Sequence, residues 1–223
     1  KQARKFAMQE INKSDLKYDI VGADEFKESQ VSSYDNVIFV ADGYERYEDS
    51  DRENVGKIDK GVFEEVLQCL QPSENVASGA TIYYKKKVYQ SGYCYDKGLK
   101  NFIMPLYRGV PAKDPAYMNR LKFRQNVSLL GEGVFAIKSG TLLQYLQKSE
   151  NKEDLFSNEF YFALCLYIKG KAEKCVVSPL VPLKICSKVK NTNIKKDFIE
   201  IRQKDLTYNA NMNVFGKYYF LWK

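Results

Sequence analysis

One short stretch of the chain places an acidic side chain at the end of a strand-like apolar run. Val37–Val40 precedes Ala41-Asp42-Gly43, and further acids follow up to residue 51. In an open α/β sheet, the carboxyl end of a strand lies at the crevice where ligands bind. A carboxylate there suits a hard divalent cation, which prefers oxygen ligands. Asp42 is therefore a candidate metal ligand, and the alternative is a turn aspartate beside a solvated acidic loop.

A second candidate carboxylate lies in the first turn of the helix expected after Ser157. The N-terminal end of a helix favours an anionic side chain, and Glu159 occupies that position. A carboxylate directed from there toward a cleft has the chemistry of a general base. The alternative is that Glu159 only stabilises the end of its helix.

Three cations surround another predicted strand. Arg120, Lys122 and Arg124 have the charge and the hydrogen-bond donors to bind phosphate. The alternative is that they form the basic, solvent-facing side of that strand.

The amino-acid composition limits the kinds of catalytic and metal site that the chain can form. The 223 residues contain no histidine, which excludes Ser-His-Asp and Cys-His catalysis and histidine-ligated zinc. A general base then has to be Asp, Glu, Lys, Tyr or Cys. The five cysteines form no CxxC pair and are expected to be reduced and buried. The formal net charge of +7 favours anionic partners, although Lys85–Lys87 is the one tight basic run in the sequence.

Helices and strands have to position these residues, and their order along the chain predicts an α/β protein. Helices are expected over residues 1–17, 62–70, 141–146 and 157–169. Strands are expected over 18–23, 37–40, 75–84, 88–92, 123–130, 133–137 and 175–181, the last of them broken by proline. Residues 43–60 and 95–120 are expected to be long loops.

No linker, repeat or change of composition divides the chain, so a single domain over 1–223 is expected. It would consist of an N-terminal helix and strand (1–33), a core (34–186) and a C-terminal extension (187–223). No apolar segment of 18 residues is present, so no membrane-spanning helix is predicted.

The order of these elements resembles that of family 2 glycosyltransferases, which have the GT-A fold. The resemblance covers residues 34–213 and matches the C-terminal two-thirds of such an enzyme. It rests on the strand that ends at Asp42-Gly43, the amphipathic helix after it, and the segments NVASGATIYYKKKVYQSG, MPLYRGVPAKDPAY, NVSLLGEGVFAIKSGTL, SNEFYFALCLYIKGK and CVVSPLVPL. The run DLTYNANMN, residues 205–213, is similar to one near the end of many bacterial members.

The resemblance implies a GT-A-like mixed sheet flanked by helices, with the N-terminal nucleotide-binding part missing or degenerate. It also implies roles for the candidate residues. Asp42 would hold Mg²⁺ or Mn²⁺, and Glu159 would be the catalytic base. The donor phosphates would lie near Asp42, Gly43, Arg120 and Arg124, and the acceptor near Glu132, Tyr107 and Arg108.

The expected reaction is an inverting transfer of a sugar from a nucleotide-sugar donor to a growing cell-surface glycan or a lipid-linked acceptor. The expected location is the bacterial cytoplasm, with association at the inner face of the membrane. The absent nucleotide-binding half, and Phe160 in place of a second acid after Glu159, favour an alternative. In that alternative the chain is a non-catalytic GT-A-like module that binds a glycan or a protein partner. The net charge and the aromatic residues suggest a nucleic-acid partner, but no recognised motif supports one and the acidic residues of the 45–53 loop argue against it. Nucleic acid is therefore not an expected partner.

Overall fold

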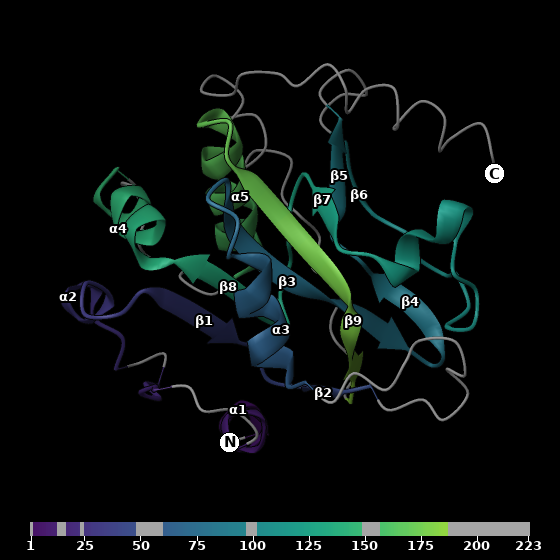
Figure 1. Ribbon diagram of the computed structural model, residues 1–223, viewed down its shortest axis with the longest axis horizontal. Helices are drawn as coiled ribbons and strands as arrows, with labels where there is room; N and C mark the ends of the chain where they lie inside the picture. The colour runs from purple at the N-terminus through teal and green to yellow at the C-terminus, as the bar shows by residue number, and fades with distance from the viewer. Residues whose placement is uncertain are drawn as a thin grey trace.

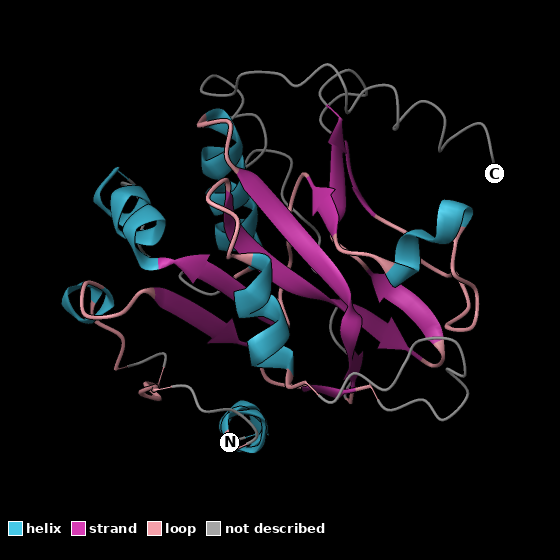
Figure 2. Cartoon of the chain, viewed as in Figure 1, coloured by secondary structure: helices cyan, strands magenta, loops and turns pink. Residues whose placement is uncertain are grey.

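A computed structural model describes residues 2–12, 17–22, 25–47, 60–96, 102–148 and 157–186 of the chain. Helices and strands alternate around a mixed seven-stranded sheet, which confirms the predicted α/β class (Figure 1, Figure 2). The helices are α1 (Gln2–Ile11), α2 (Glu28–Val31), α3 (Val62–Cys69), the 3-10 helix η1 (Tyr117–Lys122), α4 (Ser139–Lys148) and α5 (Asn158–Gly170). The strands are β1 (Asn36–Val40), β2 (Tyr44–Arg46), β3 (Asn75–Tyr84), β4 (Lys87–Gln90), β5 (Tyr93–Asp96), β6 (Phe102–Pro105), β7 (Gln125–Val127), β8 (Val134–Lys138) and β9 (Lys174–Ile185).

The large sheet is built around the long strands β3 and β9. Its strand order is β1-β8-β3-β9-β2, with β4 paired to β3 and β7 paired to β9. β3 and β9 are parallel, and the other pairings in this sheet are antiparallel. β3 is buried over all of its length except the two ends, as expected for an inner strand that is covered on both faces.

Apolar side chains cover the two faces of this sheet in separate clusters. On one face α1 and α3 pack together, and the rings of Phe6 and Phe63 meet edge to face at 6.0 Å. On the other face α5 packs around Phe39 and Phe135, and the ring of Tyr161 stacks on Phe135 at 4.8 Å. The sheet therefore has an α3 face and an α5 face.

The predicted proline break in the last strand is wrong, because β9 continues from Lys174 to Ile185. Its register against β3 jumps from Ala80↔Ser178 to Ile82↔Leu183, so both prolines fall within a bulge. On the other side of β9, β7 pairs with residues 175–177 and β2 pairs with residues 183–185, so neither strand pairs with the prolines. The missing N–H groups of the prolines are tolerated at such positions.

Other differences concern regions where loops and strands alternate. Residues 18–22 are irregular rather than a strand, and the strand predicted over 123–130 shortens to β7. The long loop predicted over 95–120 is partly ordered, because it contains β6 and the start of η1. The predicted helix over 1–17 forms as the shorter α1. The predicted C-terminal extension, 187–223, and the run over 205–213 lie outside the described residues.

Candidate functional site

Two hydrogen bonds join three segments that the sequence singles out. The main-chain N–H of Ala41, beside Asp42, donates to the carbonyl of Gly133 at 2.9 Å. The N–H of Glu132 in turn donates to the side-chain oxygen of Asn158 at 3.1 Å. The turn after β1, the loop before β8 and the start of α5 are therefore consecutive neighbours at one edge of the sheet. We call this place the Glu132 junction.

The backbone of Glu132 is held on both sides by buried polar side chains. Asn158, 7% exposed, accepts from its N–H, and the side-chain amide of Gln90, 2% exposed, lies 3.4 Å from its carbonyl oxygen. Buried amide side chains are costly unless they are hydrogen-bonded, so both residues hold the loop in place. The position of Glu132 is consequently fixed by α5 and β4 and not by its own short loop.

Three buried tyrosines, on β2, β5 and α5, are affected by the charge of Glu132. Burial raises the pKa values of Tyr44, Tyr93 and Tyr161, and the negative charge of Glu132 raises them further. An electrostatic effect on three phenols means that the carboxylate lies close to all three. Glu132 is therefore a half-buried anion among phenol groups.

The hydroxyl of Tyr44 is the least satisfied group of the junction. Tyr44 is 1% exposed, and its hydroxyl makes no hydrogen bond within the described residues. Burial raises the pKa of Tyr44 most, and the charge of Glu132 and a hydrogen-bond contact with its carboxylate raise it further, so Glu132 lies beside the hydroxyl although the pair does not meet strict hydrogen-bond geometry. A buried hydroxyl without a partner costs about 1–3 kcal/mol, which makes it a natural contact for a bound polar molecule.

Arg108 brings a positive charge to the same place. Its guanidinium lies over the ring of Tyr89, 4.7 Å from the centroid, and its Nε donates to the Tyr89 carbonyl at 3.1 Å. The charge of Arg108 also lowers the pKa of Tyr93, against the larger effect of burial. Arg108 and Glu132, which the sequence predicts on the acceptor side, are linked through β4, because Arg108 donates to Tyr89 and the next residue, Gln90, donates to the Glu132 carbonyl.

Glu159 lies next to the junction in the chain, one residue after Asn158. Ser157 caps α5, because its hydroxyl accepts from the N–H of Phe160 at 3.1 Å. Glu159 is half-buried in the first turn of the helix, where the helix dipole favours its negative charge. The helix start therefore presents Asn158 to the Glu132 loop, and Glu159 follows in the same turn.

Asp42 is exposed and already has a structural partner. Its Oδ1 accepts the N–H of Ala3, in the first turn of α1, at 2.6 Å. The next residue, Gly43, has φ +87, a left-handed conformation that favours glycine, and its carbonyl accepts from Cys186 at 2.8 Å. Asp42 therefore serves as an N-terminal cap of α1, which packs on the α3 face.

Asp42 has one carboxylate oxygen left with which it could bind a divalent cation. Oδ1 is used, which leaves the second oxygen for a cation that is also held by substrate phosphates. Over the described residues, no group of three or more Cys, Asp or Glu side chains has a metal-binding arrangement. Asp42 by itself has the chemistry for the protein side of a shared metal site.

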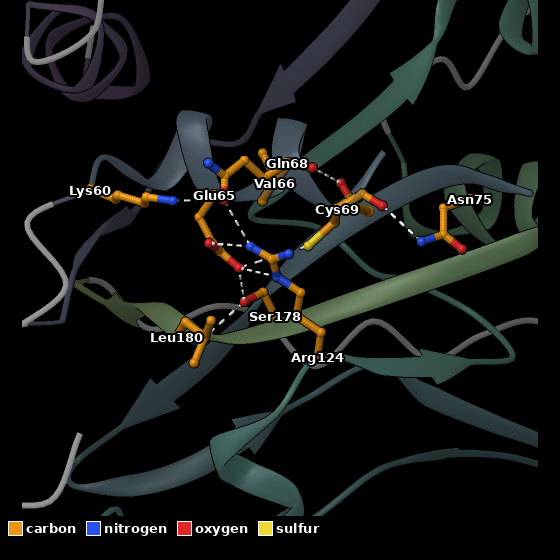
Figure 3. A network of polar contacts seen from close by, with 10 residues as sticks. Lys60, Glu65, Val66, Gln68, Cys69, Asn75, Arg124, Ser178 and Leu180 are labelled. Carbon is orange, nitrogen blue, oxygen red and sulfur yellow. Dashed lines mark hydrogen bonds and ion pairs between the residues drawn. The ribbon is translucent and has the colours of Figure 1, made fainter. Parts of the chain in front are cut away.

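Arg124 is committed to an ion pair on the α3 face. Its guanidinium holds the carboxylate of Glu65 with two contacts of 2.7 and 2.8 Å (Figure 3). Ser178 donates to the same carboxylate at 2.7 Å. The next residue of β9 toward its start, Val177, belongs to the core on the α5 face, so Arg124 and Glu159 lie on opposite faces of the sheet.

The remaining two predicted residues lie with η1 and β7. The buried hydroxyl of Tyr107 donates to the side chain of Gln125 at 2.9 Å. The carbonyl of Arg120 accepts from the amide of Gln125, and the Arg120 side chain is half-buried. Both residues therefore contact Gln125, and neither takes part in the hydrogen bonds that build the Glu132 junction.

An open cleft of about 530 Å³ lies on the α1 side of the molecule. It is lined by polar residues of α1, β2 and β9 together with Phe6: Gln9, Glu10, Asn12, Glu45, Arg46 and Lys184. Glu10 is fixed at its floor, because its carboxylate accepts the N–H of Val62 at 2.6 Å and caps α3. This cleft adjoins the helix that Asp42 caps.

The sequence missed the residues that support Glu132. Gln90 and Asn158 are polar positions in a strand and at a helix start, and Tyr44 follows a glycine turn. The residues that they contact in the fold are distant from them in the chain. Their residue types alone therefore do not predict these contacts. Asn158 is the one whose role the sequence comes nearest to indicating, because it lies between Ser157, where the helix begins, and Glu159, a candidate base.

Comparisons of this chain with protein-family models, with curated proteins and with solved structures found no match. In the part of the chain that the structure describes, none of the helices has the length and apolarity needed to cross a bilayer.

Proposed function

We propose that the chain is a glycosyltransferase with a GT-A-like fold that transfers a sugar from a nucleotide-sugar donor to a glycan or lipid-linked acceptor. One observation carries this proposal. The contacts Ala41–Gly133 and Glu132–Asn158 join the turn of Asp42, the loop of Glu132 and the helix start that carries Glu159. The order of these segments in the chain is the basis of the resemblance, and their meeting at one edge of a mixed sheet supports it.

The chemistry of the junction suits a saccharide. A pyranose presents hydroxyl pairs to a carboxylate or guanidinium and an apolar face to an aromatic ring. Glu132, Arg108 and the partly exposed ring of Tyr89 offer these three kinds of contact together. The buried hydroxyl of Tyr44 adds a group that a bound hydroxyl can satisfy.

The proposed reaction gives each carboxylate one task. The oxygen of an acceptor hydroxyl attacks the anomeric carbon, Glu159 takes the proton of that hydroxyl, and the nucleoside diphosphate leaves with the electron pair of the broken bond. Glu132 orients the acceptor through other hydroxyls. Bound at Asp42, Mg²⁺ or Mn²⁺ would neutralise the charge on the departing diphosphate.

The first test is donor binding. Titration with UDP- and dTDP-sugars in the presence of Mn²⁺ should show saturable heat in calorimetry. Asp42→Ala should abolish it, whereas Asp35→Ala, an exposed acid at the opposite end of β1, should not. The absence of binding at millimolar donor contradicts the proposal.

The second test separates the two glutamates. Glu159→Gln should lower kcat about 100-fold or more, as expected for a lost general base, with little change in KM for the acceptor. Glu132→Gln should mainly raise the acceptor KM. Glu64→Gln is the matched control, because Glu64 is also half-buried in the first turn of a helix, α3. A similar loss of kcat in Glu64→Gln would show that the effect is not specific to Glu159.

A second candidate function is a non-catalytic module with the same fold that binds a glycan. It is favoured by two contacts: Asp42 already caps α1, and Arg124 already binds Glu65. This module would bind oligosaccharides at the Glu132 junction without any nucleotide sugar. Glycan binding that Glu132→Gln weakens, together with no donor binding, would favour it over the enzyme.

A further inference from the structure

One region of the described structure gathers many cations and few acids. We call this region the basic lobe: the turn between β3 and β4, residues 85–87, and residues 108–123. It contains seven cations, Lys85, Lys86, Lys87, Arg108, Lys113, Arg120 and Lys122, and one acid, Asp114. Its formal charge is +6, against +7 for the whole chain. The rest of the protein is therefore close to neutral.

Main-chain hydrogen bonds join the two parts of the basic lobe. The N–H of Val88 donates to Val110, that of Gly109 donates to Val88, and that of Ala112 donates to Lys86, each at 2.8 Å. In Figure 1 the tip of β4 and the short teal helical turn of η1 lie at the same end of the molecule. The lysines of the turn and the cations of residues 108–123 consequently form one surface.

The same lobe carries the two most exposed large apolar side chains of the described residues. Met118 is 70% exposed and Phe123 is 62% exposed, whereas the other exposed large apolar residues do not exceed 44%. Between them in the chain stand Arg120 and Lys122. Large apolar groups that protrude among cations are typical of surfaces that enter the interface of a lipid bilayer.

The lobe is held rigidly beneath this surface. Leu121, 3% exposed, and Ala112, 8% exposed, pack against Tyr83 and Val88 of the sheet. Met118 has a positive φ of 54, a conformation that bulky residues adopt at a cost of about 1–3 kcal/mol. The buried contacts hold the backbone in this conformation, and Met118 remains on the outside.

We propose that the basic lobe docks on the surface of a bilayer that contains anionic phospholipids. The cations lie at the level of the lipid phosphates, and Met118 and Phe123 enter the boundary between headgroups and acyl chains. Each Lys or Arg near such a surface is attracted by its negative potential, and the apolar side chains add the burial that charge alone does not provide. A lipid interface takes up both kinds of group at once, because its phosphates face the cations and its acyl chains face the apolar side chains. The docking does not depend on sugar transfer.

The test is co-sedimentation of the full chain with vesicles. Vesicles of equal parts phosphatidylcholine and phosphatidylglycerol should retain the protein, and vesicles of phosphatidylcholine alone should not. Lys85→Ala/Lys86→Ala/Lys87→Ala should weaken binding by about fivefold for each cation, or on the order of 100-fold for the three. The matched control removes the same charge from the other side of the molecule: Arg4→Ala/Lys5→Ala/Lys17→Ala, all exposed.

The apolar part is tested with Met118→Ser/Phe123→Ser. This variant should bind roughly tenfold more weakly and should lose the binding that the native chain retains at high salt. Its control is Met8→Ser/Val21→Ser, which replaces exposed apolar residues elsewhere. Circular dichroism of each variant establishes that it is folded.

Three outcomes would overturn the proposal. The first is no binding to the anionic vesicles. The second is an equal loss in the control triple variant, which would mean that net charge alone drives binding. The third is unchanged vesicle binding by the Met118 and Phe123 variant together with tighter, salt-dependent binding to duplex DNA, which would identify a nucleic acid as the occupant.

Discussion

The carboxylate of Glu65 on the α3 face and that of Glu132 at the junction are both anions among polar groups, but their partners differ. Glu65 is 2% exposed and accepts hydrogen bonds from Arg124 and Ser178 (Figure 3). Glu132 is only half-buried, and the buried Tyr44 hydroxyl beside it has no partner within the described residues. One cluster is closed by full hydrogen bonds within the protein, and in the other the Tyr44 hydroxyl and the Glu132 carboxylate lie side by side without strict hydrogen-bond geometry.

This difference separates an architectural charge from a candidate site. A buried, bidentate ion pair links α3 to the segment before β7 and to β9, and it offers nothing to a ligand. At the junction the main chain of Glu132 is fixed by Gln90 and Asn158, while its carboxylate is left among phenols. A fixed backbone with an available side chain is the arrangement expected of a binding residue.

The largest effect is expected from Glu65→Ala. Removing one partner of a buried ion pair costs about 3–5 kcal/mol, and Arg124 is 38% exposed, so about 3 kcal/mol is expected here. Urea unfolding measures it. Glu64→Ala, a half-buried neighbour in the same helical turn, should cost no more than about 1 kcal/mol. Equal losses in the two variants would mean that the ion pair contributes nothing of its own.

The next largest effect is expected in the dependence of the free energy of unfolding on pH. Burial alone would raise the pKa of Glu65, but the hydrogen bonds from Arg124 and Ser178 outweigh it and hold the pKa below its ordinary value of 4.5. Because the folded pKa is the lower one, this stabilisation is fully present above pH 4.5 and is lost as the pH falls through the folded pKa. Urea unfolding of the native chain and of Glu65→Gln should therefore converge at acid pH. Parallel curves would contradict the ion-pair assignment.

A smaller effect is expected from Ser157→Ala at the start of α5. Loss of this cap should cost about 1 kcal/mol, because the N–H of Phe160 loses its acceptor. The same variant should loosen Asn158 and with it the Glu132 loop, which hydrogen exchange at the Glu132 amide reports. Ser33→Ala, at an exposed position, is the control and should change neither quantity.

The smallest effect on stability is expected from Tyr44→Phe. Its hydroxyl has no partner within the described residues, so its removal should be neutral or should stabilise the fold by up to about 1 kcal/mol. Tyr107→Phe is the contrasting variant, because it breaks a hydrogen bond to Gln125 and should cost about 1 kcal/mol. Sugar binding should fall in Tyr44→Phe alone. A clear loss of stability in Tyr44→Phe would show that the hydroxyl is satisfied after all.

The sequence by itself determined the local elements with strong periodicity and clear ends. The amphipathic helix α3, the helix that begins after Ser157 and the apolar strand β1 each depend on neighbouring residues, and all three formed as predicted. The α/β class followed from the alternation of such elements. The prolines of β9 misled the prediction, because their tolerance depends on how β3, β7 and β2 pair around them.

Only the tertiary structure decided which charges are available. The sequence predicts Arg124 as a phosphate ligand. In the structure it pairs with Glu65, which is 59 residues away in the chain. The support of Glu132 by Asn158 spans 26 residues, and the basic lobe forms only when the turn at 85–87 pairs with the segment at 108–112. Electrostatic and hydrogen-bond energies depend on distances in space, and residue types along a chain do not contain those distances.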